Sequence, residues 1–245
     1  MFAERWDTVD GLRMHAYVDP EPTTKPPLVL VHGLGVSTRY LRPTGERLLP
    51  AFAVYAPNLP GFGPSDKPRP PLGLEGLAGA LEGWLRTAGI ERPTLVANSF
   101  GCQIAVELAA RAPAIVGRLV LVGPTVDRHA RSITRQLFGL ARDSLSEPLA
   151  LNLLVVRDYL RAGPIRVWKT AQEALADPIE DKISRLEQPL LIVLGERDGF
   201  VSEPWARELE ARAPNARLEI VPGAAHAVNF NSPDALAKLV REFAS

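Results

Sequence analysis

The chain has 245 residues, of which 46% are hydrophobic and 23% charged, so it fits one large α/β domain or two small ones and disorder is not expected. Its 28 basic residues balance 28 acidic residues, which argues against a nucleic-acid-binding surface. A single cysteine, Cys102, excludes an internal disulfide framework and a multi-cysteine zinc site. No secretory signal is visible in residues 1–20, and no run of about 18 apolar residues follows. We therefore expect a cytoplasmic protein without a membrane span.

Short apolar runs alternate along the chain with longer helical patterns. Runs bounded by Gly or Pro predict buried strands at 28–31, 51–55, 94–97, 118–122, 189–194 and 218–221. Helical patterns occupy 74–88, 100–111, 204–212 and 233–243. Alternation of strands and helices with crossovers of this size predicts an α/β fold with a doubly wound, mostly parallel sheet.

The segment 127–185 interrupts this alternation, because it contains no convincing buried strand. Ser144, Glu147-Pro148, Gly163-Pro164 and Asp177-Pro178 are expected to divide it into several short helices. Open α/β sheets bind ligands at the carboxyl ends of their strands, so we interpret this segment as a helical cap, or lid, over that edge. Residues 1–126 and 186–245 would form the core, and the whole chain one structural unit.

Ser99 lies where a predicted strand ends and a helix begins, within Ala97-x-Ser99-x-Gly101. Small residues two before and two after a serine permit the sharp turn of a nucleophile elbow, which presents the hydroxyl at the edge of the sheet. An ordinary helix N-cap would also explain a serine here.

Glycines follow the first predicted buried strand in His32-Gly33-Leu34-Gly35. The backbone N–H groups of Leu34 and Phe100 are the candidate donors of an oxyanion hole, and His32 is expected to support the loop.

Two further residues follow predicted strands, Asp198 after 190–194 and His226 after 218–221. The order Ser99, Asp198, His226 is the chain order of an α/β-hydrolase catalytic triad. Asp127, just after strand 118–122, is the alternative acid.

Five segments carry a resemblance to a known family. They are His32-Gly33-Leu34-Gly35, Asn58-Leu59-Pro60-Gly61-Phe62-Gly63-Pro64-Ser65-Asp66, Asn98-Ser99-Phe100-Gly101, Gly195-Glu196-Arg197-Asp198 and Gly223-Ala224-Ala225-His226. On these motifs the chain resembles the α/β-hydrolase superfamily, in its capped branch of serine esterases, over about residues 10–243. It departs from the pattern at Ala97, which replaces the first elbow glycine. The resemblance implies a helical cap inserted after the sixth strand, a Ser-His-Asp mechanism, and no metal or organic cofactor.

The expected substrate is a small to medium, mostly apolar carboxylic ester, cleaved through an acyl-enzyme. Pocket candidates from the cap and from the segment after His226 are Phe138, Leu153, Leu154, Trp168 and Val228. Carbon–carbon bond hydrolysis of ring-cleavage products, lactone or thioester hydrolysis, and a slow ligand-binding receptor remain alternatives on the same scaffold. Either a monomer or a homodimer is compatible with the sequence, and Cys102 is expected to pack inside the helix after Ser99.

Overall fold

Eight strands form a single sheet in the computed structural model, which describes residues 2–21 and 24–244. In chain order the strands are β1 (Ala3–Val9), β2 (Leu12–Val18), β3 (Pro27–Val31), β4 (Ala53–Pro57), β5 (Thr94–Asn98), β6 (Arg118–Val122), β7 (Leu190–Gly195) and β8 (Ala216–Val221). Their order across the sheet is β1-β2-β4-β3-β5-β6-β7-β8. The pairs β1–β2 and β2–β4 are antiparallel and every other pair is parallel, which confirms the predicted sheet type.

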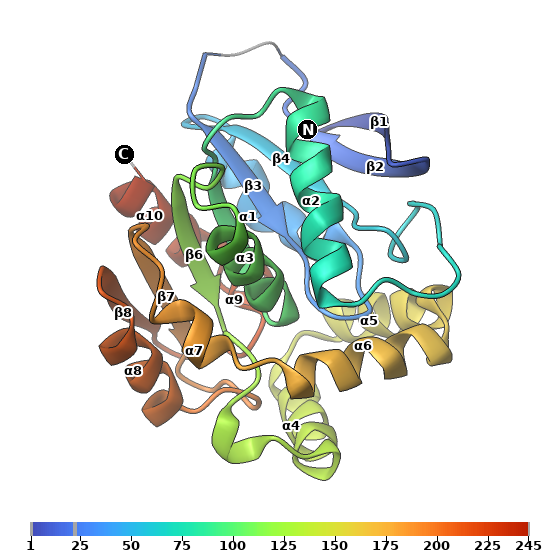
Figure 1. The fold of residues 1–245 in the computed structure, drawn as a ribbon. Helices are drawn as coiled ribbons and strands as arrows, with labels where there is room; N and C mark the ends of the chain where they lie inside the picture. The colour runs from blue at the N-terminus through green and yellow to red at the C-terminus, as the bar shows by residue number, and fades with distance from the viewer. Residues whose placement is uncertain (1, 22–23, 245) are drawn as a thin grey trace.

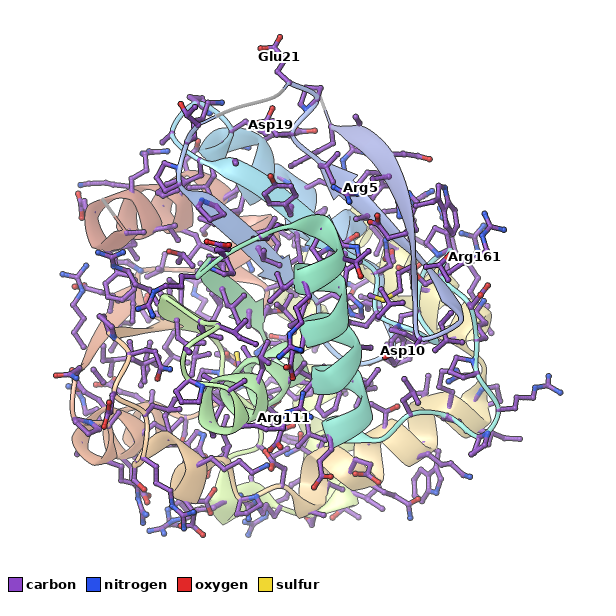
Figure 2. All side chains as sticks on the ribbon, turned by 45° about the horizontal axis from the view of Figure 1, so that its top comes forward. Arg5, Asp10, Asp19, Glu21, Arg111 and Arg161 are labelled. Carbon is purple, nitrogen blue, oxygen red and sulfur yellow. The ribbon has the colours of Figure 1, made fainter. Side chains whose placement is uncertain are left out.

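Helices cover both faces of the sheet (Figure 1). Outside the segment 127–185 they are η1 (Thr38–Leu41), α1 (Arg42–Leu48), α2 (Leu74–Ala88), α3 (Phe100–Arg111), α8 (Glu203–Arg212), α9 (Val228–Asn231) and α10 (Pro233–Ala244). Successive side chains of a strand point to opposite faces, so Leu95 and Ala97 of β5 pack in the layer of α2 and α3, while Val96 packs in the layer of α1 and α10. An ion pair between Arg111 of α3 and Glu82 of α2 links two helices on the face seen in Figure 2.

The antiparallel hairpin β1–β2 and helix α1 were not predicted. In β1 half-buried and exposed residues alternate, because this edge strand faces the protein on one side only, and it therefore lacks the continuous apolar run of a central strand. Strand β4 begins two residues later than predicted, since the backbone N–H groups of Ala51 and Phe52 still bond to the carbonyl of Leu48 at the end of α1.

Between β6 and β7 the chain forms helices and no strand. They are η2 (Arg128–Ala130), α4 (Ile133–Ser146), α5 (Leu149–Ala162), α6 (Pro164–Ala176) and α7 (Ile179–Ile183). Breaks occur at Pro148, Gly163 and Asp177, but the break expected at Ser144 was wrong, because this residue continues α4 and bonds to the carbonyl of Leu140. We refer to residues 127–185 as the insertion. Its helices α4, α5 and α6 lie beyond the carboxyl ends of the parallel strands (Figure 1).

Across residues 2–21 and 24–244, none of the helices is long and apolar enough to cross a bilayer.

Candidate active site

Ser99 occupies the tight turn between β5 and α3. Its backbone has φ 57° and ψ −127°, a strained conformation for a non-glycine residue that typically costs about 1–3 kcal/mol. Residue 101 has to be a glycine, because a Cβ there would lie 2.6 Å from the carbonyl oxygen of Val31 and 2.7 Å from that of His32. The methyl group of Ala97, two residues before the turn, is fully buried and accommodated. The turn presents Ser99 at the carboxyl edge of the sheet, as in a nucleophile elbow.

The side chains of Asp198 and His226 form a pair at the same edge. His226 Nδ1 lies 2.8 Å from Asp198 Oδ2, and the other oxygen of Asp198 accepts hydrogen bonds from the backbone N–H groups of Phe200, at 2.7 Å, and Val201, at 2.9 Å. A carboxylate facing Nδ1 keeps the proton of the neutral imidazole on that nitrogen, which leaves Nε2 as the acceptor. His226 Nε2 is buried and has no hydrogen-bond partner among the described residues.

Gly123, at the end of β6, makes room for this pair. Its φ is +56°, and a Cβ there would lie 2.8 Å from His226 Nδ1 and 3.0 Å from Asp198 Oδ2. A side chain at this position would push the aspartate and the histidine apart. Sequence reasoning missed Gly123, although a glycine directly after a predicted strand was a usable signal.

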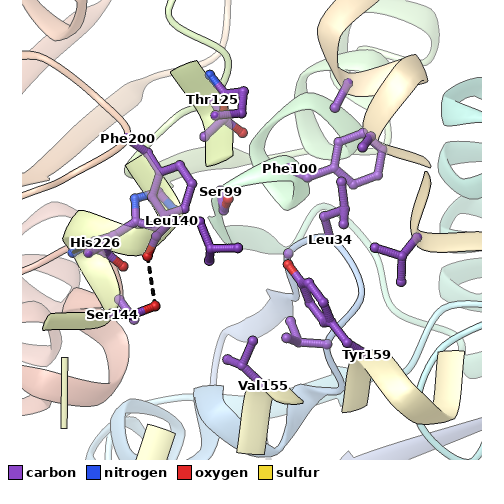
Figure 3. A pocket seen from close by; sticks show the side chains of 18 of the residues that line it. Leu34, Ser99, Phe100, Thr125, Leu140, Ser144, Val155, Tyr159, Phe200 and His226 are labelled. Carbon is purple, nitrogen blue, oxygen red and sulfur yellow. Dashed lines mark hydrogen bonds between the residues drawn. The ribbon is translucent and has the colours of Figure 1, made fainter. Parts of the chain in front are cut away.

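Ser99 and His226 line one cavity of about 670 Å³ between the sheet edge and the insertion. Leu34 and Phe100, the candidate oxyanion donors, line it as well. Figure 3 shows the serine near the centre, with the ring of Phe200 over His226 on one side and α5 on the other. The centroids of these two rings are 4.7 Å apart. The structure thus brings the five predicted residues Ser99, His226, Asp198, Leu34 and Phe100 to one place.

The loop that carries Leu34 is held from beneath by polar contacts. The N–H of Gly33 donates to the hydroxyl of Tyr40 at 2.8 Å, and that hydroxyl donates to Asn98 Oδ1 at 2.9 Å. His32 Nε2 accepts the N–H of Leu59 at 3.0 Å, so its proton lies on Nδ1 and is donated to the carbonyl of Gly33 at 2.9 Å. Burial lowers the pKa of His32 to about 4, so the ring is neutral and acts as a support, as predicted.

Two carboxylates at the C-terminal end of α4, Asp143 within the helix and Glu147 directly after it, reach the loop that carries the histidine. Asp143 accepts the backbone N–H of His226 at 3.2 Å, and Glu147 accepts that of Ala227 at 2.7 Å. Burial by itself lowers the pKa of His226, but the charge and hydrogen bond of Asp198 and the charges of Asp143 and Glu147 outweigh it and raise the pKa to about 9. Burial also raises the pKa of both Asp143 and Glu147.

The predicted pocket residues are mostly elsewhere. Trp168 lines the cavity, whereas Phe138 and Leu153 are exposed at 71% and 63%, Leu154 packs against the apolar cluster below, and Val228 is fully buried in α9. Apolar content alone could not tell which side of each helix faces the core, so these four assignments were wrong.

The inner side of α5 forms the cavity wall instead. Leu151, Val155 and Tyr159 are spaced by four residues, lie on one side of the helix and line the cavity. Burial raises the pKa of Tyr159 to about 12, so its hydroxyl stays protonated at neutral pH. This spacing was visible in the sequence but was not used.

The alternative acid, Asp127, serves another contact. Its carboxylate accepts the backbone N–H of His129 at 2.8 Å and the hydroxyl of Ser202 at 2.6 Å, and so joins the insertion to the start of α8. Cys102 is buried with its thiol on the carbonyl of Ala97 at 3.3 Å, and burial raises its pKa, in agreement with a packing role.

The family model described as the alpha/beta hydrolase family matches residues 28–239, and the chain belongs to this family. A pimeloyl-acyl-carrier-protein methyl ester esterase of Xanthomonas campestris is 29% identical over 89% of this chain and 94% of its own length. The biotin biosynthesis bifunctional protein BioHC of Cellvibrio japonicus is also 29% identical, over 90% of this chain. The chain spans only about half, 48%, of that relative.

Solved structures agree in fold. The enol-lactonase of Burkholderia xenovorans superposes with a TM-score of 0.84 at 23% identity, covering 98% of this chain and 99% of that one. A carboxylesterase of Bacillus subtilis superposes with a TM-score of 0.78 at 19% identity, covering 100% and 92%. At these identities the similarity shows the fold, and the chemistry has to be argued from the site.

Proposed function

We propose that the protein is a serine hydrolase that cleaves carboxylic esters of small to medium, mostly apolar acyl groups. The observation that carries the proposal is the strained turn at Ser99, which opens into the same cavity as the paired His226 and Asp198. A strained serine beside a histidine–carboxylate pair is the arrangement used for acyl transfer on this fold. Relatives named as esterases support the reaction type.

In the proposed reaction, Ser99 Oγ attacks the ester carbonyl carbon while His226 Nε2 takes the hydroxyl proton. Asp198 holds the imidazole in the required tautomer and stabilises the imidazolium that forms. The backbone N–H groups of Leu34 and Phe100 would meet the negative oxygen of the tetrahedral intermediate, each contributing about 3 kcal/mol in the transition state. His226 then gives the proton to the leaving alcohol, and water hydrolyses the acyl-enzyme with the histidine as base.

The cavity supports an apolar acyl group. Its wall is formed mainly by apolar side chains of α5 and α6, and the insertion would act as a cap that covers them. Each methylene moved from water into such a wall contributes about 0.8 kcal/mol, or about fourfold in kcat/KM, until the cavity is filled. The Xanthomonas relative is named for a methyl ester on a carrier-bound acyl chain, and an acyl chain of that kind is compatible with this cavity.

The test combines labelling and turnover. A fluorophosphonate probe should modify one serine, and digestion with mass spectrometry should locate the adduct on the peptide that contains Ser99. Hydrolysis of p-nitrophenyl esters from acetate to decanoate should rise with acyl length and then fall once the cavity is full. An adduct on another serine would contradict the assignment of the nucleophile. Labelling at Ser99 without hydrolysis of any ester would contradict the substrate class.

Removing the charge of Asp143 should shift the acid limb of the profile of kcat/KM against pH. The proposed base acts only when neutral, so a pKa of about 9 for His226 places the rise of kcat/KM near that pH. In Asp143→Asn the side chain can still accept the N–H of His226 but carries no charge, so the pKa of the histidine should fall. The limb then moves to lower pH, and kcat/KM at pH 7 rises several-fold.

A matched control for this shift is Asp158→Asn. Asp158 is another buried carboxylate of the insertion, but it accepts hydrogen bonds from Ser37 and not from the histidine loop. Its removal should leave the position of the acid limb unchanged. A limb that stays in place in Asp143→Asn, or moves equally in both variants, would contradict the electrostatic role of Asp143.

A further inference from the structure

Exposed apolar side chains are concentrated on the insertion. Nine of the ten large hydrophobic residues that are exposed in the described chain lie between positions 133 and 168, and the tenth is Trp6. The nine are Ile133, Phe138, Leu145, Leu149, Leu153, Val156, Leu160, Ile165 and Trp168. We refer to this set, together with the arginines described below, as the outer face. Apolar side chains gathered in this way usually mark an interaction surface.

Helical spacing makes the outer face continuous along α5. Leu149, Leu153, Val156 and Leu160 follow one another at intervals of four, three and four residues, so they form a single stripe. Their exposures range from 58% to 77%. The opposite side of the same helix carries the buried Leu151 and Asp158, so α5 presents apolar side chains to the exterior as well as to the interior.

Every exposed charged side chain between positions 128 and 172 is basic, and the next one along α6 is the acidic Glu173. The basic side chains are Arg128, Arg135, Arg142, Arg157, Arg161 and Lys169. The acidic residues of this stretch, Asp143, Glu147 and Asp158, are all buried against the core. For Arg142, Arg157 and Arg161 the described part of the chain provides no ion pair, and Arg161 lies at the edge of the molecule in Figure 2. A chain of zero net charge thus presents a locally positive face.

Part of the outer face also lines the cavity. Four of its apolar residues, Ile133, Val156, Leu160 and Trp168, are exposed and also line the cavity that contains Ser99. An apolar molecule at the outer face would therefore reach the candidate nucleophile without crossing a polar surface.

We propose that the outer face binds to a lipid–water interface that carries negatively charged head groups. Protruding leucines and aromatic rings would enter the boundary between head groups and acyl chains, while the arginines remain at the level of the anionic groups. A second copy of the chain is disfavoured as the partner, because two such faces would place arginines opposite arginines. The proposal concerns binding and does not depend on the proposed ester hydrolysis.

The test measures binding to vesicles by cosedimentation. Vesicles of pure phosphatidylcholine should retain little protein, and vesicles with equal parts of phosphatidylglycerol should retain most of it at low salt. Added salt should release it, because head-group attraction is screened. Each basic residue near an anionic surface contributes about fivefold to the partition coefficient.

Two double variants address the face without touching the cavity wall. Leu145→Ser with Leu153→Ser removes protruding apolar groups, and Arg157→Glu with Arg161→Glu reverses charges; both should abolish vesicle binding. Their matched controls, Trp6→Ser and Arg86→Glu with Arg217→Glu, change an exposed tryptophan and two exposed arginines outside the insertion and should bind as the wild type does. All should keep the circular-dichroism spectrum and the urea-unfolding midpoint of the wild type, which shows that they are folded whether or not the protein hydrolyses esters.

Three results would overturn the proposal. The first is a wild-type protein that does not sediment with phosphatidylglycerol vesicles at low salt, and the second is binding that the outer-face variants retain. The third is evidence that the outer face binds a different partner while the protein does not bind vesicles. That partner would be a second copy of the chain, if the same substitutions break a dimer, or an acidic carrier protein, if the wild type binds one. Sedimentation velocity and a binding assay with such a carrier distinguish these cases.

Discussion

Replacing Ser99 by alanine is expected to lower kcat/KM for p-nitrophenyl esters by about 10⁵–10⁶-fold, because the attacking oxygen is lost while the cavity and the oxyanion donors remain. The free energy of unfolding should not fall, since the strained backbone at φ 57° is present in both proteins and the hydroxyl makes no hydrogen bond within the described chain. Steady-state kinetics under substrate excess and urea denaturation measure the two quantities.

Ser144→Ala provides the matched control for this substitution. Ser144 lines the same cavity, but its hydroxyl donates to the carbonyl of Leu140 within α4 (Figure 3). Loss of that hydroxyl should change kcat/KM by no more than a few-fold. If Ser99→Ala retained activity within tenfold of the wild type, or if Ser144→Ala were the inactive variant, the proposed nucleophile would be wrong.

Replacing Asp198 by asparagine should lower kcat by about 10⁴-fold while the fold stays intact. The asparagine amide would donate towards His226 Nδ1, so the imidazole would carry its proton on Nε2 and could no longer accept one from Ser99. KM should change little, because Asp198 contacts the histidine and the loop at Phe200 and does not line the cavity. The measurement is the full dependence of rate on ester concentration.

Asp127→Asn is the control that shows whether the loss of activity is specific to Asp198 or follows from the removal of any buried carboxylate near the site. Asp127 lies after the neighbouring strand β6, is also buried, and bonds to Ser202 and the backbone of His129. Its replacement should weaken the contact between the insertion and α8 but leave most of the activity. A larger loss in Asp127→Asn than in Asp198→Asn would transfer the role of the acid to Asp127.

The parallel part of the sheet could be predicted from the sequence because its strands are covered on both faces. Such strands appear as continuous apolar runs, as at 118–122, and the glycine and proline residues around them mark their ends. The hairpin β1–β2 was not predicted because β1 does not alternate apolar and polar residues. Its half-buried side carries the ion pair of Arg5 and Asp7, and its exposed side carries Trp6. The gathering of Ser99, Asp198 and His226 at one edge could also be predicted, since each lies in the loop or turn that follows a parallel strand.

The parts of the site that depend on how the insertion packs were not predictable in the same way. Asp143 lies in the last turn of α4 and Glu147 directly follows the helix, a placement that equally suits two solvated acids. Their contacts with His226 and Ala227 arise from the side of the helix that packs on the core, and this is decided by tertiary contacts. Because the sequence does not show which side of α5 packs on the core, Leu153 was predicted to line the cavity and Val155 was not.

Three of the buried carboxylates of the insertion each accept a backbone N–H from a loop at the sheet edge. Asp143 holds His226, Glu147 holds Ala227, and Asp158 holds Ser37 just after the loop of Leu34. A transplanted insertion from another member of the family would therefore leave these three amides without acceptors unless it brought oxygen atoms to the same points. An experimenter who exchanges the whole insertion to change the substrate therefore has to keep these acceptors on its inner side. Residues on its outer side can be varied without disturbing the loops.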